Sequence, residues 1–427
     1  MMWRKALCGP RRRSWRRWAS SAGAVALGAA GLVAVPAAGP AYAASVPCND
    51  AALVTAVAGV ATPGGSLSLS PGCTYTLNAV DNPDNGLAVI TGSVSITGNG
   101  ATIVRSSTAP SFRIFEIGSG GTLSLTGLTL RGGSVTGQGG AVLVNGGGTL
   151  NSSRTGFIEN AATSDGGAIS VLASGTSTSS RDVYTDNVSG LHGGAVNSEG
   201  TTTIAGAALT GNRAVEGGGV NNDTSTSDIT ISGSAFSRNI VNGSTGDGAG
   251  ADFDGGTVKI SKSDFSRNTT TRTTTFGFAG AIYNNANLTV TGSSVNRNTL
   301  TTAGSGAQGG GFYNDGTLTL TTSTVNGNAV NGTAGNDSGG IYNDGTLVLE
   351  RSTVNENTVA NGVAGGIFND GGSVTATGST VSDNTSSAAP GGISSTNASV
   401  TLSGSPVTGN SPTNCVGSPV PIAGCTG

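Results

Sequence analysis

The sequence predicts an all-β fold, a single right-handed parallel β-helix of about twelve three-strand coils. Two short motifs alternate strictly, each recurring ten times along the chain. Each repeat holds three short runs in which Val, Ile, Leu and Thr alternate, bounded by Gly, Asn and Asp. The composition agrees, because 73 Gly residues and an aromatic content of 4% suit a narrow aliphatic core with many turns. A repeat unit of this kind cannot bury its apolar face alone, so neighbouring units must stack.

The two motifs set the length of one coil. The first is a pair of small residues before an apolar residue, and its intervals run from 25 to 32 residues. The second is an apolar residue three places before an Asn, at intervals of 25 to 30 residues. Three strands in such a period predict one coil about 4.8 Å above the last. The second motif ends on Asn160, Asn187, Asn212, Asn239, Asn268, Asn298, Asn328, Asn357, Asn384 and Asn410.

An Asn at one fixed place in each coil has a structural explanation. Its side-chain amide can bond to the amides of the coils above and below. We therefore expect these ten side chains to form a ladder along the stack, with no catalytic role.

The chain is divided into four predicted segments. Residues 1–43 are a signal peptide, 44–138 an N-terminal cap with irregular first coils, 139–410 the repeats, and 411–427 a C-terminal loop. The first coil needs a lid, since an open end exposes core and unpaired backbone. A helix with its N-cap at Asn49-Asp50 supplies that lid, with an apolar face formed by Leu53, Ala56, Val57 and Val60.

The N-terminus has the pattern of an export signal. Seven basic residues in the first eighteen precede an Ala/Gly/Val-rich run and the small-x-small motif Ala41-Tyr42-Ala43. A membrane anchor is the alternative, but the run is short and its side chains are small. Without this segment, 13 basic and 23 acidic side chains remain, a net charge near −10. Such a charge disfavours nucleic acids and anionic membranes as partners, and no membrane span is expected after cleavage.

Four cysteines remain in the expected mature chain. An even number in an exported protein indicates disulfides, and proximity pairs Cys48 with Cys73 and Cys415 with Cys425. Their spacing fits no zinc site. The protein is expected to be secreted, extracellular or held at the cell surface, as a monomer.

The motifs also resemble those of a known family. Gly166-Gly167-Ala168-Ile169, with Phe157-Ile158-Glu159-Asn160, is similar to the repeats of polymorphic outer-membrane proteins, within the pectate-lyase-like right-handed parallel β-helix proteins. The resemblance covers roughly residues 139–410. It implies a surface or secreted adhesin.

Two classes of function follow. The first is a non-enzymatic, adhesin-like protein that binds a glycan or a surface protein, with no catalytic residue. The alternative is a polysaccharide lyase or hydrolase, which would bring three or more acids and an Arg or Lys into one groove. His192, the one histidine, lies at a coil turn and is interpreted as structural. Ice binding, suggested by Thr-rich runs, is disfavoured because flat Thr arrays need a constant coil length.

A ligand-binding column is predicted from one aromatic slot in four successive coils. Because strand neighbours point to opposite faces, aromatic residues that follow inward Ile or Phe residues should point outward. The alternative is an inward aromatic ladder. The residues of this slot are Tyr283, Tyr313, Tyr342 and Phe368.

Two groups of acids are candidates for calcium binding. Asp315, Asp344 and Asp370 each precede a turn Gly and should stack. Asp252 and Asp254 lie where the repeat is irregular. A register slip by one residue would point Phe253 inward and both carboxylates outward. The alternative for both groups is ordinary solvated turn acids.

Overall fold

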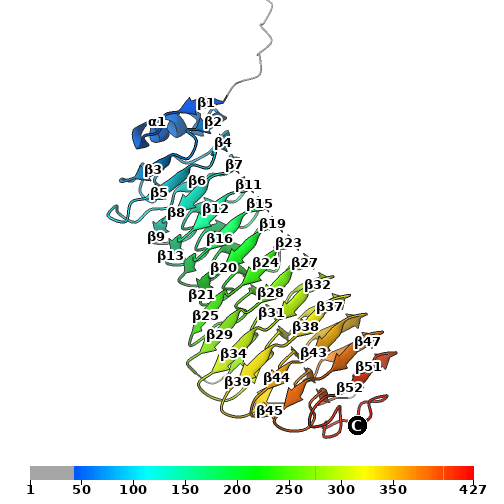
Figure 1. The fold of residues 1–427 in the computed structure, drawn as a ribbon. Helices are drawn as coiled ribbons and strands as arrows, with labels where there is room; N and C mark the ends of the chain where they lie inside the picture. Colours follow the sequence, from blue (N-terminus) through cyan, green and yellow to red (C-terminus); the bar gives the residue numbers. More distant parts are fainter. Residues whose placement is uncertain (1–42, 275, 398) are drawn as a thin grey trace, which may run out of the picture. The chain divides into compact units, whose positions relative to one another are not determined.

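The structure, a computed structural model, describes residues 43–427 except 275 and 398. These residues group into one compact unit, a parallel β-solenoid of the right-handed type with about 13 turns (Figure 1). Nearly all of the predicted signal peptide, residues 1–42, lies outside the described residues.

The three predicted runs of each repeat form three long parallel sheets. A fourteen-stranded sheet runs from β1 (Ala44–Val46) to β51 (Val400–Ser403). An eleven-stranded sheet runs from β6 (Phe115–Ile117) to β50 (Ile393–Ser395), and a thirteen-stranded sheet from β3 (Thr74–Leu77) to β52 (Val407–Thr408).

The coils contain more strands than the three predicted. A ten-stranded sheet of short strands runs from β9 (Ser134–Val135) to β49 (Thr385–Ser386). Such strands are too short to show an alternating pattern, so the sequence did not predict them. Four coils add one further strand each, which together form a four-stranded sheet. Its strands are β30 (Gly277–Phe278), β35 (Ala307–Gln308), β40 (Asn336–Asp337) and β45 (Gly362–Val363).

Alternation along the strands builds the core. In β37 (Thr317–Thr321), Leu318 and Leu320 are buried while the three Thr residues point outward. Stacked aliphatic and aromatic side chains of successive coils join into one continuous core cluster from Val46 to Ile422.

The variation in coil length lies outside the fourteen-stranded sheet. Its five-residue strands β7 (Thr122–Thr126) to β47 (Ser373–Thr377) pair residue for residue. Five residues separate β21 (Arg213–Ala214) from β22 (Val220–Asn222), whereas nine separate β29 (Thr269–Arg272) from β31 (Ile282–Asn284). Unequal coils therefore still produce a regular outer face.

The ten predicted Asn residues form the expected ladder. Nδ2 of Asn239 donates to Oδ1 of Asn268 at 3.0 Å, and Nδ2 of Asn268 donates to Oδ1 of Asn298 at 2.9 Å. The same bond links every successive pair from Asn160 to Asn410, and each side chain is buried. Each amide also donates to a backbone carbonyl one coil earlier, as Asn268 does to Phe236. The predicted ladder is confirmed.

Both ends of the solenoid carry further features. Helix α1 (Asp50–Ala61) begins after the N-cap Asn49, whose side chain accepts from the backbone N–H of Ala52 at 2.8 Å. Its buried residues Leu53, Val57 and Ala61 join the core cluster. The two predicted cysteine pairs, Cys48–Cys73 and Cys415–Cys425, are disulfides.

Candidate functional site

The predicted aromatic column points out of the coil interior. Tyr283, Tyr313, Tyr342 and Phe368 lie side by side in β31, β36 (Phe312–Asn314), β41 (Ile341–Asn343) and β46 (Ile367–Asn369). Successive rings stack with centroids 5.3, 4.9 and 5.5 Å apart. The residues before them, such as Ile282 and Ile341, face the core cluster as expected. The inward ladder is therefore excluded.

The column is nevertheless not an exposed surface. Tyr342 is 3% exposed and Phe368 is 9% exposed. They pack with residues on and beside the four-stranded sheet, including Phe278 and Ala364, in a small core of their own. The prediction of an exposed aromatic surface is therefore wrong for Tyr313, Tyr342 and Phe368, whereas Tyr283 is half-buried. The strands of the extra sheet have two residues each, too few to show an alternating pattern in the sequence.

The predicted acid column follows the same strands. Asp315 and Asp344 are exposed, and Asp370 is half-buried. The Tyr342 hydroxyl donates to Oδ2 of Asp370 at 2.7 Å. Burial, with Asp315 and Asp370 nearby, raises the pKa of Asp344 above its usual value. Calcium binding at these carboxylates stays a prediction.

The predicted register slip is present at Asp252. Asp252 in β26 (Ala251–Phe253) pairs with Asn221 and Tyr283, so it occupies the outward slot, and Phe253 enters the core cluster. Asp254 is exposed, but Asp252 is buried and its Oδ1 has no hydrogen-bond partner. Burial, followed by the charges of Asp254 and Asp247, raises the pKa of Asp252 well above its usual value.

Polar residues gather at a further position of the repeat, here called the polar slot. This slot directly precedes a small or Gly pair in successive coils. Backbone hydrogen bonds from the following Gly place each member beside the next. Its members are Gln138, Asp165, His192, Glu216 and Asp247. Their recurrence before the Gly pair is visible in the sequence, and it places His192 next to acids in the same position of the neighbouring coils.

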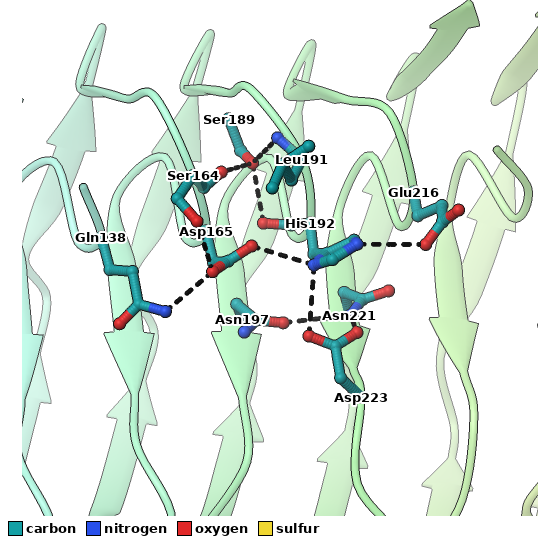
Figure 2. A network of polar contacts seen from close by, with 10 residues as sticks. All are labelled: Gln138, Ser164, Asp165, Ser189, Leu191, His192, Asn197, Glu216, Asn221 and Asp223. Atoms are coloured by element: carbon teal, nitrogen blue, oxygen red, sulfur yellow. Dashed lines mark hydrogen bonds and ion pairs between the residues drawn. The ribbon is translucent and has the colours of Figure 1, made fainter. Parts of the chain in front are cut away.

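Three carboxylates surround His192 (Figure 2). Nδ1 lies 2.9 Å from Oδ1 of Asp165 and 3.3 Å from Oδ2 of Asp223. Nε2 lies 3.2 Å from Oε2 of Glu216. Of the described residues, only Asp165, His192 and Asp223 form a group of three His, Cys, Asp or Glu whose possible ligand atoms lie within 4.8 Å of one another.

The charges of this cluster are strongly coupled. Close contact with the carboxylates of Asp165, then Asp223 and Glu216, raises the pKa of His192 to about 12. Burial alone would raise the pKa of Asp165, but the close contact with His192 and hydrogen bonds from Ser164 and Gln138 outweigh it and lower that pKa to about 2. The three carboxylates therefore favour the protonated, imidazolium form of His192.

A second ion pair lies further along the slot. Arg272 Nη1 is 2.9 Å from Oδ1 of Asp247. Burial raises the pKa of Asp247 to about 7 despite the opposing charge of Arg272. The slot thus holds several acids, and Arg272 of β29 lies beside one of them, which is part of what the enzyme hypothesis requires.

Comparison with known proteins adds a weak likeness of fold. No family model and no curated protein match the sequence. A solved structure that it resembles is that of PfbA, a surface adhesin of Streptococcus pneumoniae, at 15% identity and a TM-score of 0.46, covering 82% of this chain and 94% of that chain. The similarity to polymorphic outer-membrane repeats is not matched by any of these comparisons.

A search of the described residues for membrane-spanning helices finds none that is long and apolar enough.

Proposed function

We propose that this chain is an exported, non-enzymatic, adhesin-like protein that binds a glycan on the outer face of its fourteen-stranded sheet. The two disulfides support export, since such bonds persist in oxidising compartments. The binding surface differs from the aromatic column expected from the sequence, because that column is covered.

The regular hydroxyl array on this face carries the proposal. Thr317, Thr319 and Thr321 of β37 point outward. They pair in register with β32 (Asn287–Thr291) on one side and β42 (Thr346–Glu350) on the other. Outward positions recur about every 4.8 Å between coils and about 6.6 Å along a strand.

The array suits an uncharged, extended polymer better than a compact protein. Most outward residues in these strands are Thr, Ser or Asn, and charges such as Lys259 and Glu350 interrupt the rows only occasionally. Hydroxyl and amide groups can donate and accept hydrogen bonds. A glycan that presents regularly spaced hydroxyls is therefore the ligand chemistry that fits this face.

Binding to insoluble polysaccharides tests the proposal. We expect residues 44–427 to be retained on one or more of cellulose, chitin and xylan, and the double variant Thr289→Tyr/Thr319→Tyr to lose at least tenfold in affinity. Asn296→Tyr, at an outward position of the thirteen-stranded sheet, is the matched control. Equal binding by the double variant would overturn the assigned face. Ice shaping without polysaccharide retention would instead assign this face to ice binding. Ice binding was disfavoured because the coils differ in length, but the strands of this sheet are regular despite that difference.

A polysaccharide-active enzyme is the second candidate, favoured by one observation. Asp247 and Asp252 carry carboxyls with raised pKa values, about 7 for Asp247, and Arg272 lies 2.9 Å from Asp247. A buried carboxyl whose pKa is raised toward neutrality can act as a general acid. Turnover of a polysaccharide by the wild type, lost in Asp252→Asn, would establish this function instead.

A further inference from the structure

We propose that Asp165, His192 and Asp223 form a binding site for one divalent transition-metal ion, with Zn²⁺ as the preferred ion. The ligand atoms are Oδ1 of Asp165, Nδ1 of His192 and Oδ2 of Asp223. This inference concerns a different part of the surface from the hydroxyl array and does not depend on glycan binding.

The arrangement around Nδ1 leaves one carboxylate oxygen poorly satisfied. Nδ1 can carry a single hydrogen, yet it faces two carboxylate oxygens at 2.9 and 3.3 Å. The Asp165 side chain is 10% exposed, and its Oδ1 is buried without a hydrogen bond of good geometry, although it is directed at His192. One metal ion among the three atoms would satisfy all of them, whereas one proton cannot.

Each of the three ligands is also held by an outer partner. Oδ2 of Asp165 accepts from Nε2 of Gln138 at 2.8 Å and from Oγ of Ser164 at 2.7 Å, which leaves Oδ1 directed at His192 (Figure 2). Oδ1 of Asp223 accepts from Nδ2 of Asn221. Carboxylate and amide partners of this kind orient the side chains that bind metals.

Glu216 supplies the outer partner of the histidine. Its Oε2 lies 3.2 Å from Nε2, the ring nitrogen that is not a proposed ligand. A metal-binding histidine commonly donates its other N–H to a carboxylate, which fixes the tautomer and strengthens the ligand. Glu216 is therefore a positioning residue, and a proton on Nε2 leaves Nδ1 free for the ion.

The donor set distinguishes among metals. Zn²⁺ bonds of about 2.0–2.1 Å place tetrahedral ligand atoms about 3.3 Å apart. Nδ1 lies 2.9 and 3.3 Å from the two carboxylate oxygens, and those oxygens lie within 4.8 Å of each other. Calcium prefers six to eight oxygens, whereas this cluster offers two carboxylates and an imidazole. Three protein ligands leave a coordination position for water or for an oxygen of a bound molecule. His192 and Asp223 are partly exposed, so that position can reach solvent.

Metal titration of residues 44–427 tests the site. After treatment with a chelator, calorimetry with ZnCl₂ should show one ion per chain at micromolar affinity or better, and Co²⁺ should give a visible d–d absorption band. Asp223→Ala, at an exposed position, and His192→Ala should each weaken binding at least 100-fold. Glu216→Gln should weaken it about 10- to 100-fold and leave one ion per chain.

Glu159→Gln is the matched control. It removes a carboxylate from an exposed ion pair with Arg131 elsewhere on the solenoid and should bind zinc like the wild type. Circular dichroism verifies that each variant is folded. If His192→Ala fails to fold, Asp223→Ala still tests the site. Binding of no ion by the wild type, or equal binding by a folded Asp223→Ala variant, would overturn the proposal. Polysaccharide retention, measured with EDTA present, reports separately on the glycan proposal.

Discussion

The ladder Asn residues sit at a turn whose backbone explains why the position is so constant. The residue before each ladder Asn is left-handed, with φ of 57° at Arg267 and 64° at Gly327. This turn directs the Asn side chain into the stack, where the donors and the acceptor of its amide are used. A shorter or apolar side chain would leave several buried groups without partners.

We therefore expect Asn268→Ala to lower the free energy of unfolding by about 3 kcal/mol, since each unsatisfied buried group costs about 1–3 kcal/mol. Thermal unfolding followed by circular dichroism measures this loss. Asn285→Ala, at an exposed turn position, is the control and should change stability by less than about 0.5 kcal/mol. Similar effects of the two variants would show that the ladder does not contribute as proposed.

A carboxyl in the four-stranded sheet makes stability depend on pH. Burial raises the pKa of Asp337 to about 6, although a hydrogen bond from Gln308 opposes the shift. The unfolded chain releases this proton near pH 4, so the folded state loses stability as the pH rises from about 4 to 6. Asp337→Asn should remove this loss. Between pH 4 and pH 7 the variant should therefore gain about 2 kcal/mol of unfolding free energy relative to the wild type, a figure reduced for the partial exposure of Asp337.

Melting temperatures of wild type and variant across pH 4–8 measure the Asp337 effect. Asp315→Asn, which changes an exposed carboxyl, serves as the control. A wild type and an Asp337→Asn variant with parallel pH profiles would contradict the assignment.

At the scale of elements, strand alternation predicted the direction of side chains better than their exposure. It placed Tyr313 outward and Phe312 inward, and it identified the slip that brings Phe253 into the core. Strand alternation could not predict that the four-stranded sheet covers the tyrosines. The strands of that cover have two residues each, and their backbone pairs only with neighbouring coils.

The cluster around His192 shows the same limit of prediction from sequence. Asp165, His192 and Glu216 share one slot in three successive coils, so their proximity follows from the repeat. Asp223 comes from the turn after β22, and nothing in the linear pattern directs its carboxylate toward the slot. Convergence across two corners of a coil depends on side-chain conformations that only the structure supplies.

The aromatic stack and its cover should form one packing unit. Tyr313→Ala removes a ring that contacts Tyr283, Tyr342 and Phe278. We expect a loss of about 3 kcal/mol and faster hydrogen exchange in β35 and β40. Tyr342→Phe keeps the stack and removes only the bond to Asp370, so it should cost about 1 kcal/mol. If hydrogen exchange in β35 and β40 is unchanged in Tyr313→Ala, the four-stranded sheet and the aromatic stack do not form one packing unit.

At the scale of the whole solenoid, each coil contacts mainly its two neighbours, so stability is close to a sum of coil and interface terms. The ends are therefore the weakest points, because each has one neighbour only. Disulfides lie near both ends, at Cys48–Cys73 and Cys415–Cys425, where they restrict the unfolded chain. A helix packs at one end, and its role as a lid is open to a direct test.

We predict that Val57→Asp uncovers the first coil and causes self-association. Val57 of α1 is fully buried against the core cluster. An unpaired carboxylate at this position costs several kcal/mol. If α1 detaches, unpaired strand edges and apolar side chains of the first coil become accessible to a second copy. Light scattering coupled to size-exclusion chromatography should then show dimers or larger species, while Ala58→Asp, on the exposed side of the same helix, stays monomeric. If Val57→Asp remains monomeric while its far-ultraviolet spectrum shows loss of the helix, α1 is not required as a lid, and the first coil must protect its own edge.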